Sequence, residues 1–121
     1  MSSIQRLSAL GSKPGGLDPI GLSFPDWVVS GNPQEAGEVY YDTPLASATV
    51  GIWHSDPGVV RFPSYPFDEV CMVVEGSVIL RDADGGEERF GSGDVFIVPK
   101  GWAGDWIMQE PLRKFYVELK R

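Results

Sequence analysis

The sequence predicts an all-β domain in which short antiparallel strands form a sandwich or a small barrel, preceded by an extended arm. The chain has 121 residues, which is the size of one ordinary domain. Its 15 glycines and 10 prolines favour many turns over long helices. From about residue 38 onward, runs rich in β-branched and aromatic residues recur about every ten residues, and no stretch of that length shows a helical period.

Residues 1–35 are predicted to form the extended arm. Within them, residues 11–33 contain five glycines and four prolines, a composition that disfavours helix. Phe24 and Trp27 lie in this stretch, and a pair of exposed aromatic rings is unfavourable in water. We therefore expect these two side chains to pack on the body of the domain or on a second subunit.

Residues 36–121 are predicted to form a single domain built from nine strands. The hairpin turn between two of them is expected at Asp84-Gly85-Gly86, because glycine adopts positive φ at little cost. The strands are short and bounded by Gly, Pro or Asp. In chain order they are expected at Glu38–Tyr41, Ala46–His54, Val59–Phe62, Glu69–Val74, Ser77–Arg81, Glu87–Phe90, Val95–Val98, Asp105–Met108 and Leu112–Leu119.

Composition excludes several classes of function. Seventeen acidic residues against ten basic ones give a net charge of −7, so we expect no nucleic-acid partner and no membrane partner. Cys71 is the single cysteine and His54 the single histidine, which excludes an intrachain disulfide, a cysteine zinc site and a three-histidine metal site. No apolar run is long enough for a transmembrane helix, and residues 1–13 lack the apolar core of a signal peptide. We therefore expect a cytoplasmic protein.

Glu69 begins a strand whose two faces are both largely apolar. Strand alternation places Glu69, Cys71 and Val73 on one face, and residues 70, 72 and 74 on the other. A strand with this pattern is expected to be covered on both sides. A carboxylate on it would be partly desolvated and would need a cation or a donor nearby. The alternative is that Glu69 is an edge glutamate in water.

Two motifs in the chain resemble those of the cupin superfamily. Glu69, followed after six residues by Gly76, is similar to the end of the first cupin motif, and the segment Gly93–Gly101, with Pro99, is similar to the start of the second. The resemblance covers about residues 38–119. It is closest to the small cupins of the (S)-ureidoglycine aminohydrolase and ethanolamine-utilisation type. It implies a cupin-type (RmlC-like) antiparallel jelly-roll β-barrel over residues 36–121, but no single activity, because cupins carry many unrelated functions.

The chain departs from the cupin pattern at the metal-ligand positions. These positions are occupied by Pro63, Tyr65, Glu69 and Gly104, and Met108 stands where the motif has asparagine. One carboxylate and one phenol do not make a site for a first-row transition metal, which takes three or four N, O or S ligands. We therefore predict no metal and no other cofactor. A metal-dependent, aminohydrolase-like enzyme with atypical ligands is kept as an alternative.

The candidate catalytic residues are Glu69, Tyr65 and Lys114. Lys114 lies on the same strand face as Tyr116, and the residues alone leave it equally open whether that face points into the barrel or outward. The resemblance implies that it points inward, where Lys114 would be paired with Glu69. The candidate ligand-binding residues are Trp53, Cys71, Trp102, Trp106 and Tyr116, with Trp102 and Trp106 as walls.

Two functions remain open from the sequence. One is the binding of a small metabolite at the barrel mouth by Glu69, Tyr65 and Lys114, with or without metal-independent acid/base chemistry. The other is a non-catalytic ligand-binding or assembly module, which a salt-bridged Glu69–Lys114 pair without a void would favour. We further expect a homodimer, because sheets of this kind expose edge strands that need covering.

Overall fold

The computed structural model describes residues 3–121, so the first two residues of the predicted arm lie outside the described part. It contains eleven strands in two antiparallel sheets. The order in the six-stranded sheet is β1 (Asp18–Gly21), β3 (Glu35–Asp42), β4 (Ala48–Ser55), β11 (Leu112–Leu119), β6 (Asp68–Glu75) and β9 (Val95–Val98). The order in the five-stranded sheet is β2 (Val28–Gly31), β5 (Gly58–Phe62), β10 (Gly104–Met108), β7 (Ser77–Asp82) and β8 (Glu87–Gly91).

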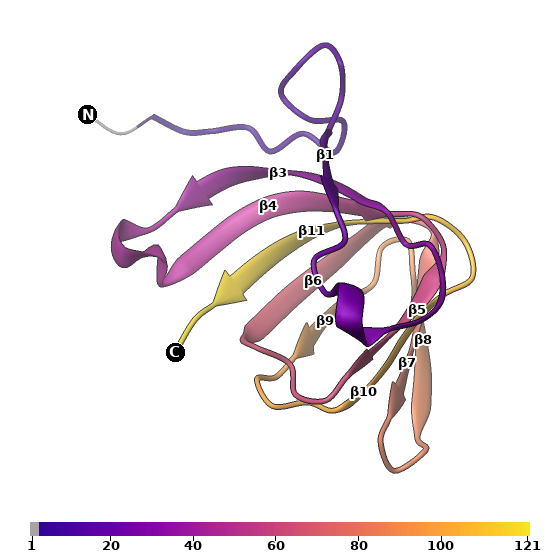
Figure 1. Cartoon of the computed structure of the whole chain (residues 1–121). Helices are drawn as coiled ribbons and strands as arrows, with labels where there is room; N and C mark the ends of the chain where they lie inside the picture. The colour runs from indigo at the N-terminus through magenta and orange to yellow at the C-terminus, as the bar shows by residue number, and fades with distance from the viewer. Residues whose placement is uncertain (1–2) are drawn as a thin grey trace.

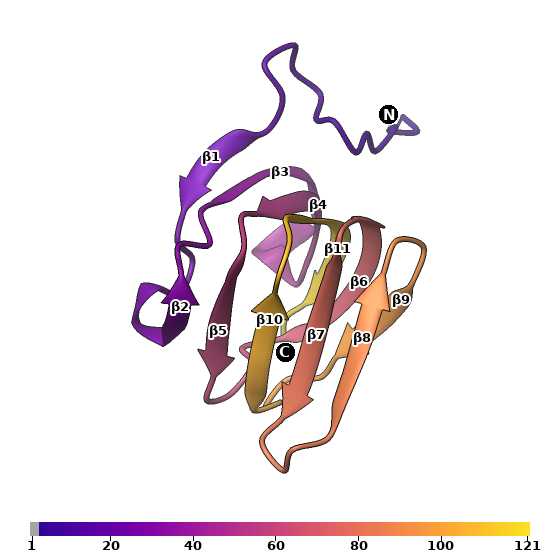
Figure 2. The same cartoon turned by 90° about the vertical axis from the view of Figure 1, so that its right-hand side faces the viewer.

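The two sheets face each other and enclose the core, as expected for a jelly roll (Figures 1 and 2). Apart from the strands, the described residues form only two short 3-10 turns, at Pro25–Trp27 and Pro44–Ala46. No helix in this part of the chain is long and apolar enough to cross a membrane. The predicted all-β fold is therefore confirmed. All nine predicted strands are present, with ends that differ by no more than a few residues.

The arm is more structured than the sequence indicated. It contributes β1, which pairs with β3, and β2, which pairs with β5, so it supplies an edge strand to each sheet. Before β1 it crosses the outer face of the six-stranded sheet (Figure 1). There the Tyr40 hydroxyl donates to the Ser8 carbonyl at 2.7 Å, and the Arg113 guanidinium donates to the carbonyl of Ala9.

Phe24 and Trp27 pack on the body of the same chain. Their rings stack with centroids 4.9 Å apart, and both meet the edge of Phe62, at 5.3 and 5.6 Å. The sequence left open whether this pair covers its own domain or a second subunit. In this chain it covers the end of the barrel next to β5.

Alternation along β6 decides what faces the core. Glu69, Cys71 and Val73 are buried between the sheets, whereas the opposite face of the strand is only half-buried. The expectation that both faces are covered therefore holds in full for the inner face and only in part for the outer one. The inward face continues into a core of aromatic and aliphatic side chains, which comprises Phe62, Tyr65, Cys71, Val73, Val78, Phe96, Val98, Trp106, Met108 and Leu112.

Candidate functional site

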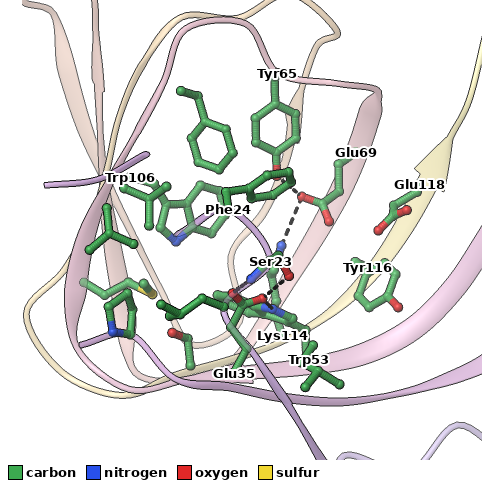
Figure 3. Close-up of a pocket in the computed structure, with 18 of the residues that line it drawn as sticks. Ser23, Phe24, Glu35, Trp53, Tyr65, Glu69, Trp106, Lys114, Tyr116 and Glu118 are labelled. Atoms are coloured by element: carbon green, nitrogen blue, oxygen red, sulfur yellow. Dashed lines mark hydrogen bonds and ion pairs between the residues drawn. The ribbon is translucent and has the colours of Figure 1, made fainter. Parts of the chain in front are cut away.

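A cavity of about 230 Å³ opens between the two sheets, beneath the arm. Both sheets and the arm contribute to its walls, and most of the lining side chains are aromatic or aliphatic (Figure 3). Its polar groups are few and come mainly from β6, β11 and β3. A concave, largely apolar site with a few convergent polar groups is typical of small-molecule binding.

Glu69, Lys114 and Tyr65 meet at one wall of this cavity. The Lys114 ammonium lies 3.0 Å from Oε1 of Glu69, and the Tyr65 hydroxyl donates to the same oxygen (Figure 3). The Cys71 sulfur lies 3.4 Å from that oxygen as well. All three contacts therefore converge on Oε1, and Oε2 makes no hydrogen bond with any described residue. Glu69 thus keeps one carboxylate oxygen available on a buried side chain.

Lys114 points into the barrel, so the inward orientation implied by the resemblance is the one observed. It is 4% exposed, and its ammonium lies 4.8 and 4.7 Å from the ring centroids of Trp53 and Trp106. Burial alone would lower the pKa of this ammonium, but the Glu69 carboxylate that it contacts outweighs that effect and raises it. Lys114 is therefore a permanent cation at neutral pH and not an amine nucleophile.

The other protic groups around Glu69 are held in their neutral forms. Burial, with the nearby Glu69 carboxylate, raises the pKa of the Tyr65 phenol well above its ordinary value. Burial likewise raises the pKa of the Cys71 thiol to about 12, although Lys114 opposes the shift. A thiol of this kind is inert at neutral pH. Tyr65 and Cys71 are consequently donors to Glu69, and neither is an activated nucleophile.

The ligand-binding residues predicted from sequence divide into two groups. Trp53, Trp106 and Tyr116 line the cavity, and Cys71 lies just behind Glu69. Trp102 does not line it, so its predicted role as a wall is wrong. Its indole donates to Asp82 at 2.7 Å, and its ring packs behind two lining residues, Tyr65 and Phe62, with centroids 6.2 and 6.4 Å apart.

Sequence reasoning missed four polar residues of the cavity, which are Ser23, Glu35, Ser55 and Glu118. Glu35 accepts the Trp53 indole N–H at 2.7 Å and the Ser23 amide and hydroxyl at 2.6 Å each. It therefore ties the arm to the cavity wall. No sequence pattern relates Ser23 in the arm to Glu35. Glu118 could have been predicted, because strand alternation from Lys114 and Tyr116 places it on the same face.

The donors at the cupin ligand positions do not fit a metal. A side chain at Gly104 would begin 2.3 Å from the Arg81 carbonyl oxygen and 2.5 Å from the Trp102 ring, so this position is filled by neighbours. The Tyr65 hydroxyl donates to Glu69, and the same Glu69 oxygen also accepts from the Lys114 ammonium. Within residues 3–121 there is no group of three or more His, Cys, Asp or Glu side chains that could hold a metal ion. His54, on the opposite face from Trp53, contacts Arg113.

Comparison with known proteins places these features in context. Residues 43–116 match the family model of the EutQ-like cupin domain. A protein of unknown function of the DUF861 family from Pseudomonas syringae superposes with a TM-score of 0.82 at 25% identity, over 93% of this chain and 46% of that one. This chain therefore spans about half the length of the Pseudomonas protein.

Two further solved structures share the fold. The putative ethanolamine utilization protein Q of Salmonella typhimurium has a TM-score of 0.61 at 23% identity, over 71% of this chain and 69% of that one. A cupin-like protein of Thermotoga maritima has a TM-score of 0.67 at 17% identity, over 90% and 82%. No curated protein matches this chain significantly.

Proposed function

Because this chain belongs to the family of EutQ-like cupin domains, in which a barrel encloses the candidate site, we propose that it binds a small organic molecule in the cavity between its sheets. One observation carries the proposal. The buried Glu69–Lys114 ion pair forms one wall of a cavity of about 230 Å³ and does not fill it. An ion pair that served stability alone would be expected to have packed surroundings, because desolvating two charges is costly.

The proposed contacts follow from the hydrogen bonds of the site. Lys114, Tyr65 and Cys71 hold the Glu69 carboxylate in place through Oε1, which leaves Oε2 to accept a donor from the bound molecule. The rings of Trp53 and Tyr116 contribute apolar surface. The cavity is smaller than the range of about 300–1,000 Å³ typical of drug-sized ligands, so the molecule should be a small metabolite.

Metal-independent acid/base chemistry is the second candidate function, and Glu69 would be its base. Tyr65 and Cys71 keep their protons at neutral pH, and Lys114 keeps its charge, so Glu69 is the one group of this cluster that can accept a proton. The base atom would be Oε2. The cavity itself argues against a pure assembly module, for which a filled site was expected.

The experiment is a thermal-shift screen of the full chain against a library of small metabolites, followed by titration of each hit. Hits should stabilise the wild type and fail to stabilise Glu69→Gln, which keeps the volume of the side chain but replaces the carboxylate. The matched control is Glu88→Gln, on the exposed strand β8. Hits that stabilise wild type and Glu69→Gln equally would place binding elsewhere and contradict the proposal.

A further inference from the structure

Two glutamates face each other across the strands that form the floor of the cavity. Glu69 on β6 and Glu118 on β11 are direct partners in the antiparallel register, and both line the cavity. Figure 3 shows their side chains on the same side of it. Like charges directly opposite each other on one sheet face are destabilising. Such a pair is favourable only where a cation or a bound proton offsets the repulsion.

No lysine or arginine in the described part of the chain forms an ion pair with Glu118. Its side chain is half-buried and makes no hydrogen bond to any described residue. Burial, together with the charge of Glu69, raises the pKa of its carboxyl group, and the charges of Lys120 and Lys114 oppose this shift without cancelling it.

The ammonium of Lys114 is already committed to other groups. It contacts Oε1 of Glu69 and the Cys71 sulfur, 3.0 and 3.5 Å away, and it lies over the rings of Trp53 and Trp106. It is the sole lysine or arginine among the described residues that line the cavity, against three glutamates. The third glutamate, Glu35, is occupied by the donors from Ser23 and Trp53.

We infer that the cavity selects a small organic ammonium compound, whose charged nitrogen lies between Oε2 of Glu69 and the carboxylate of Glu118. This inference rests on the proposed function and names its ligand class. The carbon skeleton of the compound packs against aromatic rings that line the cavity, including Phe62 and Phe67. An ammonium group supplies the missing cation and can donate to both carboxylates at once.

The same arrangement disfavours anionic ligands. A carboxylate or phosphate would need a free cation, and the one cation among the described lining residues, Lys114, is neutralised by Glu69. The anion would also approach Glu118 and the free oxygen of Glu69. Desolvating an anion beside two carboxylates without a counter-charge is strongly unfavourable.

The test uses probes that differ in charge but little in shape: benzylammonium, benzyl alcohol and benzoate, and the smaller series butylammonium, butanol and butyrate. Each is titrated into the full wild-type chain at pH 7 and constant ionic strength, with binding followed by NMR chemical shifts. We expect the ammonium member of the fitting series to bind about tenfold tighter than the alcohol, as a charged hydrogen bond provides. Benzoate and butyrate should be weakest.

A glutamine variant assigns the effect to Glu118. Glu118→Gln should weaken ammonium binding about tenfold and leave alcohol binding nearly unchanged, because only the charge is removed. Glu88→Gln should change neither, and circular dichroism verifies that both variants are folded. If Glu118→Gln weakened the binding of the ammonium and of the alcohol equally, the charge of Glu118 would have no part in selecting the ligand, and the inference would be wrong.

The outcomes separate this inference from the proposed function. If an alcohol or carboxylate probe binds as tightly as its ammonium counterpart, the cavity binds ligands but does not select a cation, and only this inference falls. If no member of either series binds, this inference falls, and the metabolite screen with Glu69→Gln decides the proposed function by itself.

Discussion

At the residue scale, Glu69 and Lys114 depend on each other. Each side chain is only 5% exposed, and the ammonium and carboxylate lie 3.0 Å apart. A buried ion pair contributes little net stability compared with apolar packing, but removal of one partner leaves the other charge uncompensated. The main effect of the pair is therefore to fix the position of the Glu69 carboxylate beside the cavity. Its net contribution to stability is small.

Replacement of Lys114 tests this interdependence. Lys114→Met should lower the free energy of unfolding by about 3–5 kcal/mol, because the Glu69 carboxylate loses its cation in a buried site. The double variant Lys114→Met, Glu69→Gln should recover much of that loss, since no charge remains to be buried. Urea unfolding measures both values. Equal destabilisation of the single and double variants would show that the cost comes from lost packing and not from the unpaired charge.

At the element scale, Glu35 joins three parts of the molecule. It lies on β3, accepts the amide and hydroxyl of Ser23 in the arm, and accepts the indole N–H of Trp53 on β4. Because Ser23 and Phe24 line the cavity, the arm between β1 and β2 forms part of its cover. The same carboxylate thus holds the cover and orients a wall residue.

Loss of this carboxylate should loosen the cover. Glu35→Ala should speed amide hydrogen exchange in residues 22–28 and leave exchange in β6 and β11 unchanged, because those strands are paired on both sides within their sheet. Exchange is measured by mass spectrometry.

The matched control for this variant is Ser12→Ala. It removes a hydroxyl contact of the arm with Glu38, also on β3, but outside the cavity. It should speed exchange only near residue 12. Unchanged exchange in residues 22–28 of Glu35→Ala would mean that Phe24 and Trp27, stacked on Phe62, hold the arm without Glu35.

At the scale of the whole molecule, the two sheets end in strands that lack a partner on one side. β9 closes the six-stranded sheet, and its outward side chains Val95 and Ile97 are 63% and 59% exposed. Edge strands with exposed apolar side chains invite pairing with another chain. Phe24 and Trp27 were expected to pack on the body or on a second subunit. They pack on Phe62 of the same chain, so they are not left exposed for a partner.

The homodimer therefore stays a prediction, now based on this edge. Sedimentation at micromolar concentration should give a dimer, because closed two-fold pairs are the commonest way to cover such a surface. Ile97→Lys should shift it to a monomer, whereas Val39→Lys, at a position 53% exposed on β3, should not. A wild-type monomer at these concentrations would contradict the prediction.

The sequence by itself determined the strands and their inward faces. Alternation is a local property of the backbone, so Glu69 and Cys71 could be placed on one buried face from β6 alone. The cupin spacing likewise identified Glu69 as a site candidate. For Lys114, alternation alone could not decide whether the side chain points into the barrel or outward. The resemblance to cupins implied the inward orientation, which is the one observed.

Only the tertiary structure decided which groups meet. The register of β11 against β6 places Glu118 opposite Glu69, and the path of the arm places Ser23 on Glu35. Trp102 does not line the cavity, and its indole N–H donates to Asp82, twenty residues earlier in the chain. Each of these contacts joins segments far apart in sequence. Their pairing depends on how the two sheets pack and on where the arm runs, which no local pattern of residues encodes.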